Sequence, residues 1–398
     1  MTGTWQSAYA ELKDFVAAHP AIKIDAGCII IPEDVRPEFY RLFDGVRLTF
    51  IESRYPASLE KNSELGRHYD EVTRRLADTL GLEKIEVLST GNDFRIDPVN
   101  TLVRLLMDPL FDLLKGNTDM AGFDSSASAA VGGAFRGFFS EGYQLWGTMA
   151  LMDVMGPQKL WRAQVEDYYI DPSSEDPCHQ EGIRDQVVPK PAETKKLLFD
   201  KSPYCNFLVP QAVIRSARLN TYAGFCPGFY EARRKAQSVS RNVEWFRIKD
   251  ISQKHAGGRM WPDLAIYLDD RLDELSLIAD CYQMARPDIL VEFMEDADWY
   301  SSGRLESVKR HQAMLKPRLG TFVFCREEVP QAAIKELEPV PAPGPAGQSP
   351  AESAGAQAAP AAEPPTEIRL LYVNYDLTRM EPVVEAVLKA RAASKEVK

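Results

Sequence analysis

The sequence lacks long apolar runs and has few cysteines, and both features limit the class of protein. It contains no run of about eighteen apolar residues, so we expect no transmembrane helix. The opening MTGTWQSAYAELKD has no basic leader before an apolar segment, so we expect no secretory signal. The six cysteines stand singly among 398 residues, which argues against a disulfide framework and predicts reduced thiols in a cytoplasmic protein.

Several well-defined chemical motifs are also missing. The glycine-rich stretch Ala121–Met155 lacks the Gly-Lys-Ser/Thr that completes a phosphate loop, and no GxGxxG follows a predicted strand. There is no GxSxG turn for a nucleophilic serine, and the adjacent Cys178 and His179 lack the spacing of a zinc site. No cofactor is therefore evident, and the glycines of Ala121–Met155 are interpreted as sites of close helix–helix packing.

The overall composition is that of an ordinary globular protein. Hydrophobic residues make up 45% and charged residues 26% of the chain, enough to build a core in each of two or three domains. The formal net charge of −11 argues against a protein covered by nucleic acid or anionic lipid.

The pattern divides the chain into five parts. We predict an α-rich N-terminal half with a few strands, including Val46–Ser53, and an α/β C-terminal half with a mixed, mostly parallel sheet and flanking helices. The predicted parts are an α-rich region (1–167), a proline- and charge-rich surface connection (168–206), an α/β domain (207–330), a disordered Pro/Ala-rich linker (331–367) and a strand–helix unit (368–398).

The α/β domain contains the strongest pattern. Strands are predicted at Pro262–Asp269, Asp288–Glu295 and Gly320–Cys325, with helices at Asp270–Ala285 and Ser301–Leu315 between them. Crossover helices of this kind join parallel strands, and ligands of such sheets bind at the carboxyl ends of the strands.

The last part of the chain is too short to fold alone. A strand at Ile368–Asp376 precedes a helix that begins with a capping box, Thr378 and Glu381. We expect this unit to dock on the sheet of its own chain. The alternative is addition to the sheet edge of a partner.

Acidic residues follow two of the predicted strands and give the candidate metal ligands Asp269, Asp270 and Glu292. Carboxylates that converge at strand ends suit Mg²⁺. The favoured alternative is that these acids cap helices, because Asp270 stands where a helix is predicted to begin.

A nuclease-like arrangement supplies the candidate catalytic residues Asp263, Asp288, Glu292 and Lys309. Restriction-endonuclease-like enzymes place Pro-Asp on one strand and Glu-x-Lys on the next. Here Pro-Asp occurs twice, but Met294 stands where the lysine is required and Lys309 lies on the following helix. The pattern is incomplete and does not establish membership of that family.

Basic residues are concentrated between 212 and 259, with aromatic residues among them. Such a segment can neutralise phosphates and stack on bases, and it supplies the candidate binding residues for a nucleotide or nucleic acid. A solvated helix face is the favoured alternative. The candidates are Arg233, Arg234, Lys235, Arg241, Arg247 and Lys249.

Three functional hypotheses follow. The first and preferred is a non-catalytic cytoplasmic interaction or regulatory protein with a protein partner. The second is a Mg²⁺-dependent phosphoryl-transfer or nuclease-like enzyme, and the third is a nucleotide- or nucleic-acid-binding module. The sequence does not define the oligomeric state.

Overall fold

The structure is a computed structural model that describes residues 4–25, 27–88, 95–164, 190–200, 210–227, 245–247, 262–275, 283–337 and 367–396. The chain forms two compact units. Unit 1 comprises Met1–Met149 with Leu198–Lys201, and unit 2 comprises Ala150–Leu197 with Ser202–Lys398. Within the described residues, every helix is too short or too polar to cross a bilayer.

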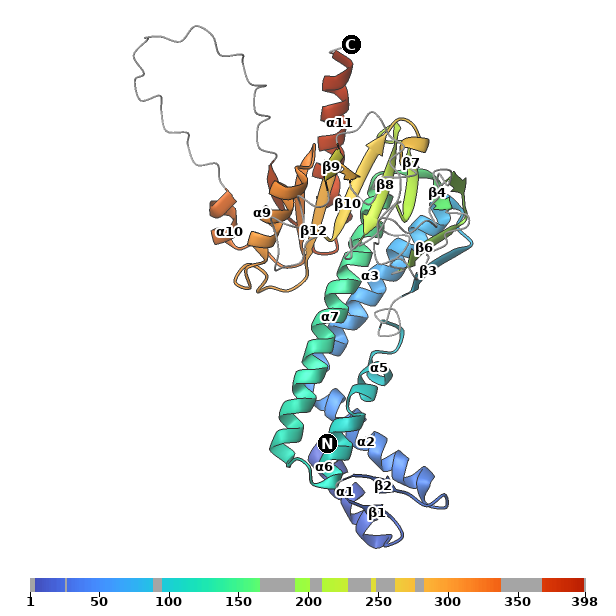
Figure 1. Ribbon diagram of the computed structural model, residues 1–398, viewed down its shortest axis with the longest axis vertical. Coiled ribbons are helices and arrows are strands. Elements are labelled where there is room, and N and C mark those ends of the chain that lie inside the picture. The colour runs from blue at the N-terminus through green and yellow to red at the C-terminus, as the bar shows by residue number, and fades with distance from the viewer. Residues whose placement is uncertain are drawn as a thin grey trace, which may run out of the picture. The chain divides into compact units, whose positions relative to one another are not determined.

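Unit 1 is built from helices (Figure 1). Polar caps begin two of them, at Thr4 and Asp97, and left-handed glycines end two others, at Gly81 and Gly116. Two short strands, β1 and β2, pair antiparallel, and β3 pairs with β6. The bounds are α1 Trp5–Ala18, β1 Lys23–Ile24, β2 Ile29–Ile30, α2 Arg36–Arg54, α3 Pro56–Leu80, β3 Lys84–Leu88, α5 Pro98–Leu105, α6 Met107–Lys115, α7 Met120–Val154 and β6 Lys196–Asp200.

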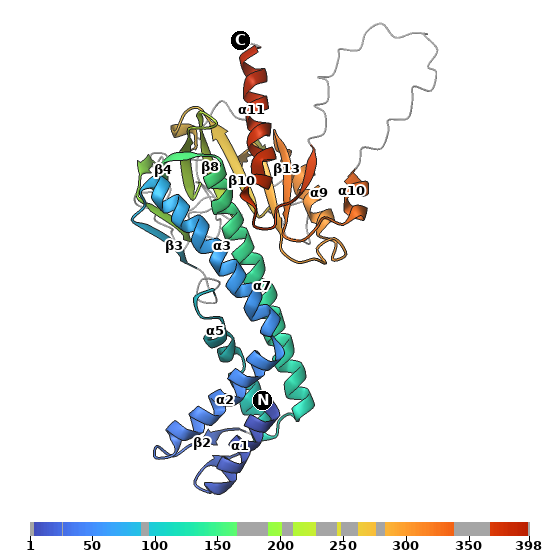
Figure 2. The same ribbon diagram turned by 180° about the vertical axis from the view of Figure 1, so that it is seen from behind.

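Helices α3 and α7 lie side by side along unit 1, as two opposite views show (Figure 2). Their contact is close at Gly142 of α7, because a Cβ atom there would stand 2.6 Å from Cδ2 of Leu65 on α3. A side chain larger than glycine at this crossing would require Leu65 to move. The predicted role of the glycine-rich stretch in helix packing is correct at this position.

Unit 2 contains an eight-stranded sheet in the order β14-β13-β12-β10-β8-β7-β4-β5. Two further strands, β9 Trp245–Arg247 and β11 Gln283–Ala285, pair with each other outside it. The strands of the large sheet are β4 Pro157–Gln164, β5 Lys190–Glu193, β7 Ala212–Ser216, β8 Thr221–Pro227, β10 Leu264–Asp269, β12 Ile289–Met294, β13 Gly320–Cys325 and β14 Ile368–Tyr372.

The sheet is mixed, as predicted, but its parallel part is confined to β12, β13 and β14. The other five pairings are antiparallel, so the expectation of a mostly parallel sheet is wrong. The difference arises in the connection between β10 and β12, where we expected a crossover helix over Asp270–Ala285. The described residues of this connection form the short 3₁₀ helix Asp273–Leu275 and β11, and the two strands that it joins are antiparallel.

Helices cover both faces of the parallel part. Helices α9 Arg304–Leu315 and α10 Gln331–Leu337 lie on one face, where Leu305, Val308 and Ala333 pack against Val323 and Cys325. The helix α11 Glu381–Glu396 lies on the other face (Figures 1 and 2). The α/β class of this half is therefore confirmed.

Three further expectations differ from the structure. The predicted strand Val46–Ser53 lies within α2, which extends to Arg54. Helix α10 occupies the first residues of the predicted linker, whose remainder, 338–366, lies outside the described residues. Strands β5 and β6 both fall within 168–206, the stretch predicted to be a surface connection, of which 168–189 and 201–206 lie outside the described residues.

Candidate functional site

Asp263 and Glu292, the first two candidate catalytic residues, lie opposite each other. Leu264 of β10 pairs with Val291 of β12, and one step further along this antiparallel register Asp263 stands opposite Glu292. Both side chains are almost completely buried. Opposed residues project to the same face of a sheet, and for these two it is the face that α9 covers.

Each of these two carboxylates is bound by groups of its own fold. Oδ2 of Asp263 accepts a hydrogen bond from the Phe293 amide at 2.8 Å and lies 3.5 Å from the Arg304 guanidinium. Oε1 of Glu292 lies 2.6 Å from Nδ1 of His311, whose side chain is 1% exposed. Arg304 and His311 both come from α9, so the two contacts fasten that helix to the sheet.

Asp288 lies at the other end of the same strand pair. Four residues separate it from Glu292 along β12, roughly 13 Å at 3.3 Å per residue. Its carboxylate accepts a hydrogen bond from the Leu268 amide at 2.7 Å and pairs with Arg318 at 2.9 Å. Burial raises the pKa of Asp288 to about 6, and Arg318 opposes this shift. The three carboxylates of the enzyme hypothesis therefore do not converge on one point.

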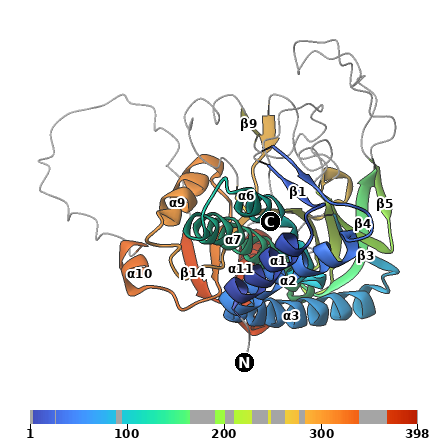
Figure 3. The same ribbon diagram turned by 90° about the horizontal axis from the view of Figure 1, so that it is seen from below.

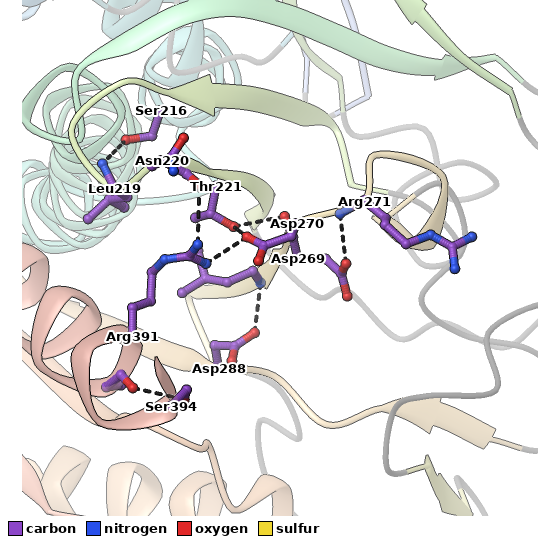
Figure 4. Close-up of polar contacts among 12 residues, drawn as sticks. Ser216, Leu219, Asn220, Thr221, Asp269, Asp270, Arg271, Asp288, Arg391 and Ser394 are labelled. Carbon is purple, nitrogen blue, oxygen red and sulfur yellow. Dashed lines mark hydrogen bonds and ion pairs between the residues drawn. The ribbon is translucent and has the colours of Figure 1, made fainter. Parts of the chain in front are cut away.

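Asp269 and Asp270 lie near Asp288, at the end of β10 (Figure 4). Burial raises the pKa of Asp269, whereas the hydrogen bond from Arg391 lowers the pKa of Asp270. Nη1 of Arg391, on α11, lies 2.7 Å from Asp270, and Thr221 donates a hydrogen bond to the same carboxylate at 2.9 Å. Asp270 thus holds the C-terminal helix against β8 and β10.

The candidate metal ligands therefore fall into two separate places, Asp269 and Asp270 at one end of the strand pair and Glu292 at the other. Antiparallel pairing is the cause, because it puts the carboxyl end of β10 beside the amino end of β12. In the part of the chain that the structure describes, no group of three or more His, Cys, Asp or Glu side chains is placed to hold a metal ion.

Lys309, the remaining catalytic candidate, is directed away from this strand pair. Its Nζ lies 3.2 Å from Oε1 of Glu306 and also binds Glu336 of α10. Glu336 in turn accepts a hydrogen bond from Tyr300 at 2.7 Å. Lys309 therefore belongs to a partly exposed network that joins α9 to α10.

The candidate residues for phosphate or nucleic-acid binding cannot be placed. Arg233, Arg234, Lys235, Arg241 and Lys249 lie outside the described residues, and of Arg247 only the backbone, in β9, is described. Two other arginines of the basic segment bind groups of their own chain: Arg215 donates to Asn220 at 2.6 Å, and Arg218 donates to Glu381 at 2.9 Å.

His311 is a site residue that the sequence interpretation missed. Leu305, Val308, His311 and Leu315 recur at helical spacing on the buried side of α9. A histidine within an apolar stripe signals a buried polar partner. The sequence does not show that this partner is Glu292.

A second candidate surface lies on α7. Between Ala121 and Ser140 of this helix, seven residues are exposed, and six of them are Gly, Ala or Ser. On the neighbouring helix α3, seven of the eight exposed residues between Glu60 and Asp78 are charged. The α7 stripe, defined by Ser125, Ala129, Gly133 and Gly137, is therefore unlike an ordinary solvated helix face.

Packing within unit 1 does not explain the glycines of this region. A Cβ atom on Gly132, Gly133 or Gly137 would meet no atom of the described residues within 4 Å. Unit 1 also carries most of the large exposed apolar side chains of the described residues, five of seven. They are Ile30, Ile96, Leu105, Met107 and Met120.

Comparison of the chain with protein-family models, with curated proteins and with solved structures finds no match.

Proposed function

We propose that this protein is a non-catalytic interaction or regulatory protein that binds a helix of another protein along the α7 stripe. The observation that carries the proposal is the exposed row of Ser125, Ala129, Gly133 and Gly137, which has open space above its glycines.

The energetic cost of this row supports the proposal. A glycine inside a helix is about 1 kcal/mol less favourable than alanine. Gly132, Gly133 and Gly137 together cost roughly 3 kcal/mol on that scale, and no neighbour within 4 Å among the described residues requires them. A partner that approaches the backbone closely would offset this cost.

The shape of the row favours a helix as the partner. Small residues four apart leave little side-chain volume along one face of α7, and such faces let the backbones of two helices approach closely. Arg136 is the one charged residue among the seven exposed positions, so the partner face should be largely apolar or small. Exposed Leu105 and Met107, at the junction of α5 and α6, add apolar surface to unit 1.

The contacts of the candidate catalytic residues also favour a non-catalytic role. Asp263, Asp288 and Glu292 each bind an amide or a basic side chain that fixes one element of unit 2 to another. These contacts give the three acids a structural role that requires no substrate.

Photo-crosslinking in the cells that produce the protein tests the proposal. A photoreactive residue replaces Ala129, and the identified adduct is compared between two variants, Gly133→Leu and Gly45→Leu. Gly45 is a matched control, because it lies in α2 with no atom within 4 Å of a Cβ.

Leucine at 133 should separate the helices and weaken the adduct about 10- to 100-fold, while leucine at 45 leaves it unchanged. The absence of any adduct at position 129, or an adduct that survives Gly133→Leu, contradicts the proposal.

A further inference from the structure

The outer edge of β14 presents backbone hydrogen-bonding groups that no described strand pairs with. Strand β14 is the last in the sheet order, and no described strand pairs with its outer side. The Glu367 carbonyl accepts a hydrogen bond from the Thr321 amide at 3.0 Å, and the Val373 amide donates one to the Cys325 carbonyl at 2.9 Å. The backbone amides and carbonyls of the odd-numbered residues therefore point toward β13. In a parallel ladder the backbone amides and carbonyls of the intervening residues point to the opposite side of the strand. The amides and carbonyls of Ile368, Leu370 and Tyr372 therefore face outward.

The two edges of the large sheet differ in how they resist pairing. The far edge, β5, has the sequence KPAE, with a lysine, a proline and a glutamate. These residues are typical of edges that avoid contact with other strands. Strand β14 has the sequence IRLLY, with a single charge and no proline. Of the outward-facing groups, the carbonyl of Tyr372 accepts a hydrogen bond from Arg379 at 3.2 Å.

Apolar side chains stand beside this edge. Ile368 and Leu370, like Leu337 of α10, pack against the buried cluster that includes Ala333, and Ile334 of the same helix is 38% exposed. Figure 3 shows α10 beside β14. An added strand would therefore find apolar surface as well as backbone partners.

We propose that the outer edge of β14 pairs antiparallel with β14 of a second copy of this chain, about a two-fold axis at Leu370. In this register Leu370 faces Leu370 of the other copy, Ile368 faces Tyr372, and Arg369 faces Leu371.

A second copy fits because the strand is complementary to itself. All cross-strand pairs on the Leu370 side are apolar, which stabilises an antiparallel pair. The one charged residue, Arg369, meets Leu371 instead of another arginine, so no like charges oppose each other. The contact is isologous and closes as a dimer. It is independent of the α7 stripe.

Sedimentation of the full chain tests the proposal through Leu370→Pro, with Leu370→Ala as its control. Both variants remove the leucine side chain, but only proline also removes the outward amide, once in each copy. We expect a concentration-dependent dimer whose dissociation constant is about 30-fold larger for the proline variant than for the alanine variant, from two hydrogen bonds.

Cysteine crosslinking tests the register without relying on the fold of the proline variant. Under oxidation, Leu370→Cys should give a disulfide-linked dimer, because facing residues of such a pair stand about 5.5 Å apart at Cα. Arg369→Cys, whose facing residue is Leu371, should not exceed the background from the exposed native Cys28.

A monomer at every concentration, or a dimer in which Leu370→Cys forms no disulfide link, overturns the proposal. A dimer that is lost in Gly133→Leu and kept in Leu370→Pro would place self-association on the α7 stripe instead.

Discussion

Replacement of Asp288 by asparagine should remove one component of the pH dependence of stability. The side chain of Asp288 is 9% exposed, and its pKa is raised from 3.8 to about 6. Between these values the folded state binds more protons than the unfolded state. The stabilising contribution is therefore complete below pH 3.8 and is lost as the pH rises through 6. At about 1.4 kcal/mol for each pKa unit, the loss between about pH 4 and 7 amounts to about 2–3 kcal/mol.

Urea unfolding at a series of pH values from about 4 to 7 measures this effect. The unfolding free energy of the wild type, minus that of Asp288→Asn, should fall by about 2–3 kcal/mol across the range. Subtraction removes the contributions of the other titrating groups. Asp270→Asn is the control, because the pKa of Asp270 is lowered from 3.8, so its contribution is complete above that value and its difference curve should be nearly flat across this range. A flat Asp288 curve would refute the claim that burial outweighs the pairing with Arg318.

Two further predictions concern packing and buried charge. Gly133→Ala should stabilise unit 1 by about 0.5–1 kcal/mol through its helix propensity. Gly142→Ala has the same propensity gain, but its new methyl group meets Leu65 at an overpacking cost of about 1–3 kcal/mol, so the net effect should lie between neutral and a loss of about 2 kcal/mol. Equal effects in thermal unfolding would contradict the assigned packing. His311→Ala leaves the buried Glu292 without its imidazole partner and should cost about 3–5 kcal/mol in urea unfolding. A loss below about 1 kcal/mol would show that this contact is not important for stability.

The sequence predicts the strands of unit 2 well but not their directions. Strands β10, β12 and β13 all fall in predicted segments, because continuous apolar runs mark buried strands. Their direction depends on the connection, and the residues after Asp269 resemble the start of a helix. Among the described residues of that connection the structure places the short 3₁₀ helix Asp273–Leu275 and β11, and β12 runs back beside β10.

A different physical effect explains the wrong strand at Val46–Ser53. The run VRLTFIES is rich in β-branched and aromatic residues, which favour strands when considered alone. In the structure Val46, Phe50 and Ile51 are buried on one side of α2. Tertiary packing of that side overrides the local preference.

The candidate site could be predicted only in part. The sequence predicted acidic candidates at the ends of the strands, but their contacts are with residues from distant segments. His311 and Arg318 lie 19 and 30 residues from Glu292 and Asp288, respectively. Spacing along a chain contains no information about such contacts until the fold is known.

If a partner covers the α7 stripe in cells, a thiol placed on the stripe is protected there, and thiol labelling measures this protection. Gly133→Cys and the control Ser63→Cys, at an exposed position of α3, are labelled with a membrane-permeable maleimide in the producing cells and in the dilute purified chain. Peptide mapping separates the introduced thiols from Cys28. We predict that the thiol of Gly133→Cys is labelled at least about tenfold more slowly in cells, while that of Ser63→Cys is labelled equally in both. Equal labelling of Gly133→Cys in the two settings would contradict the account.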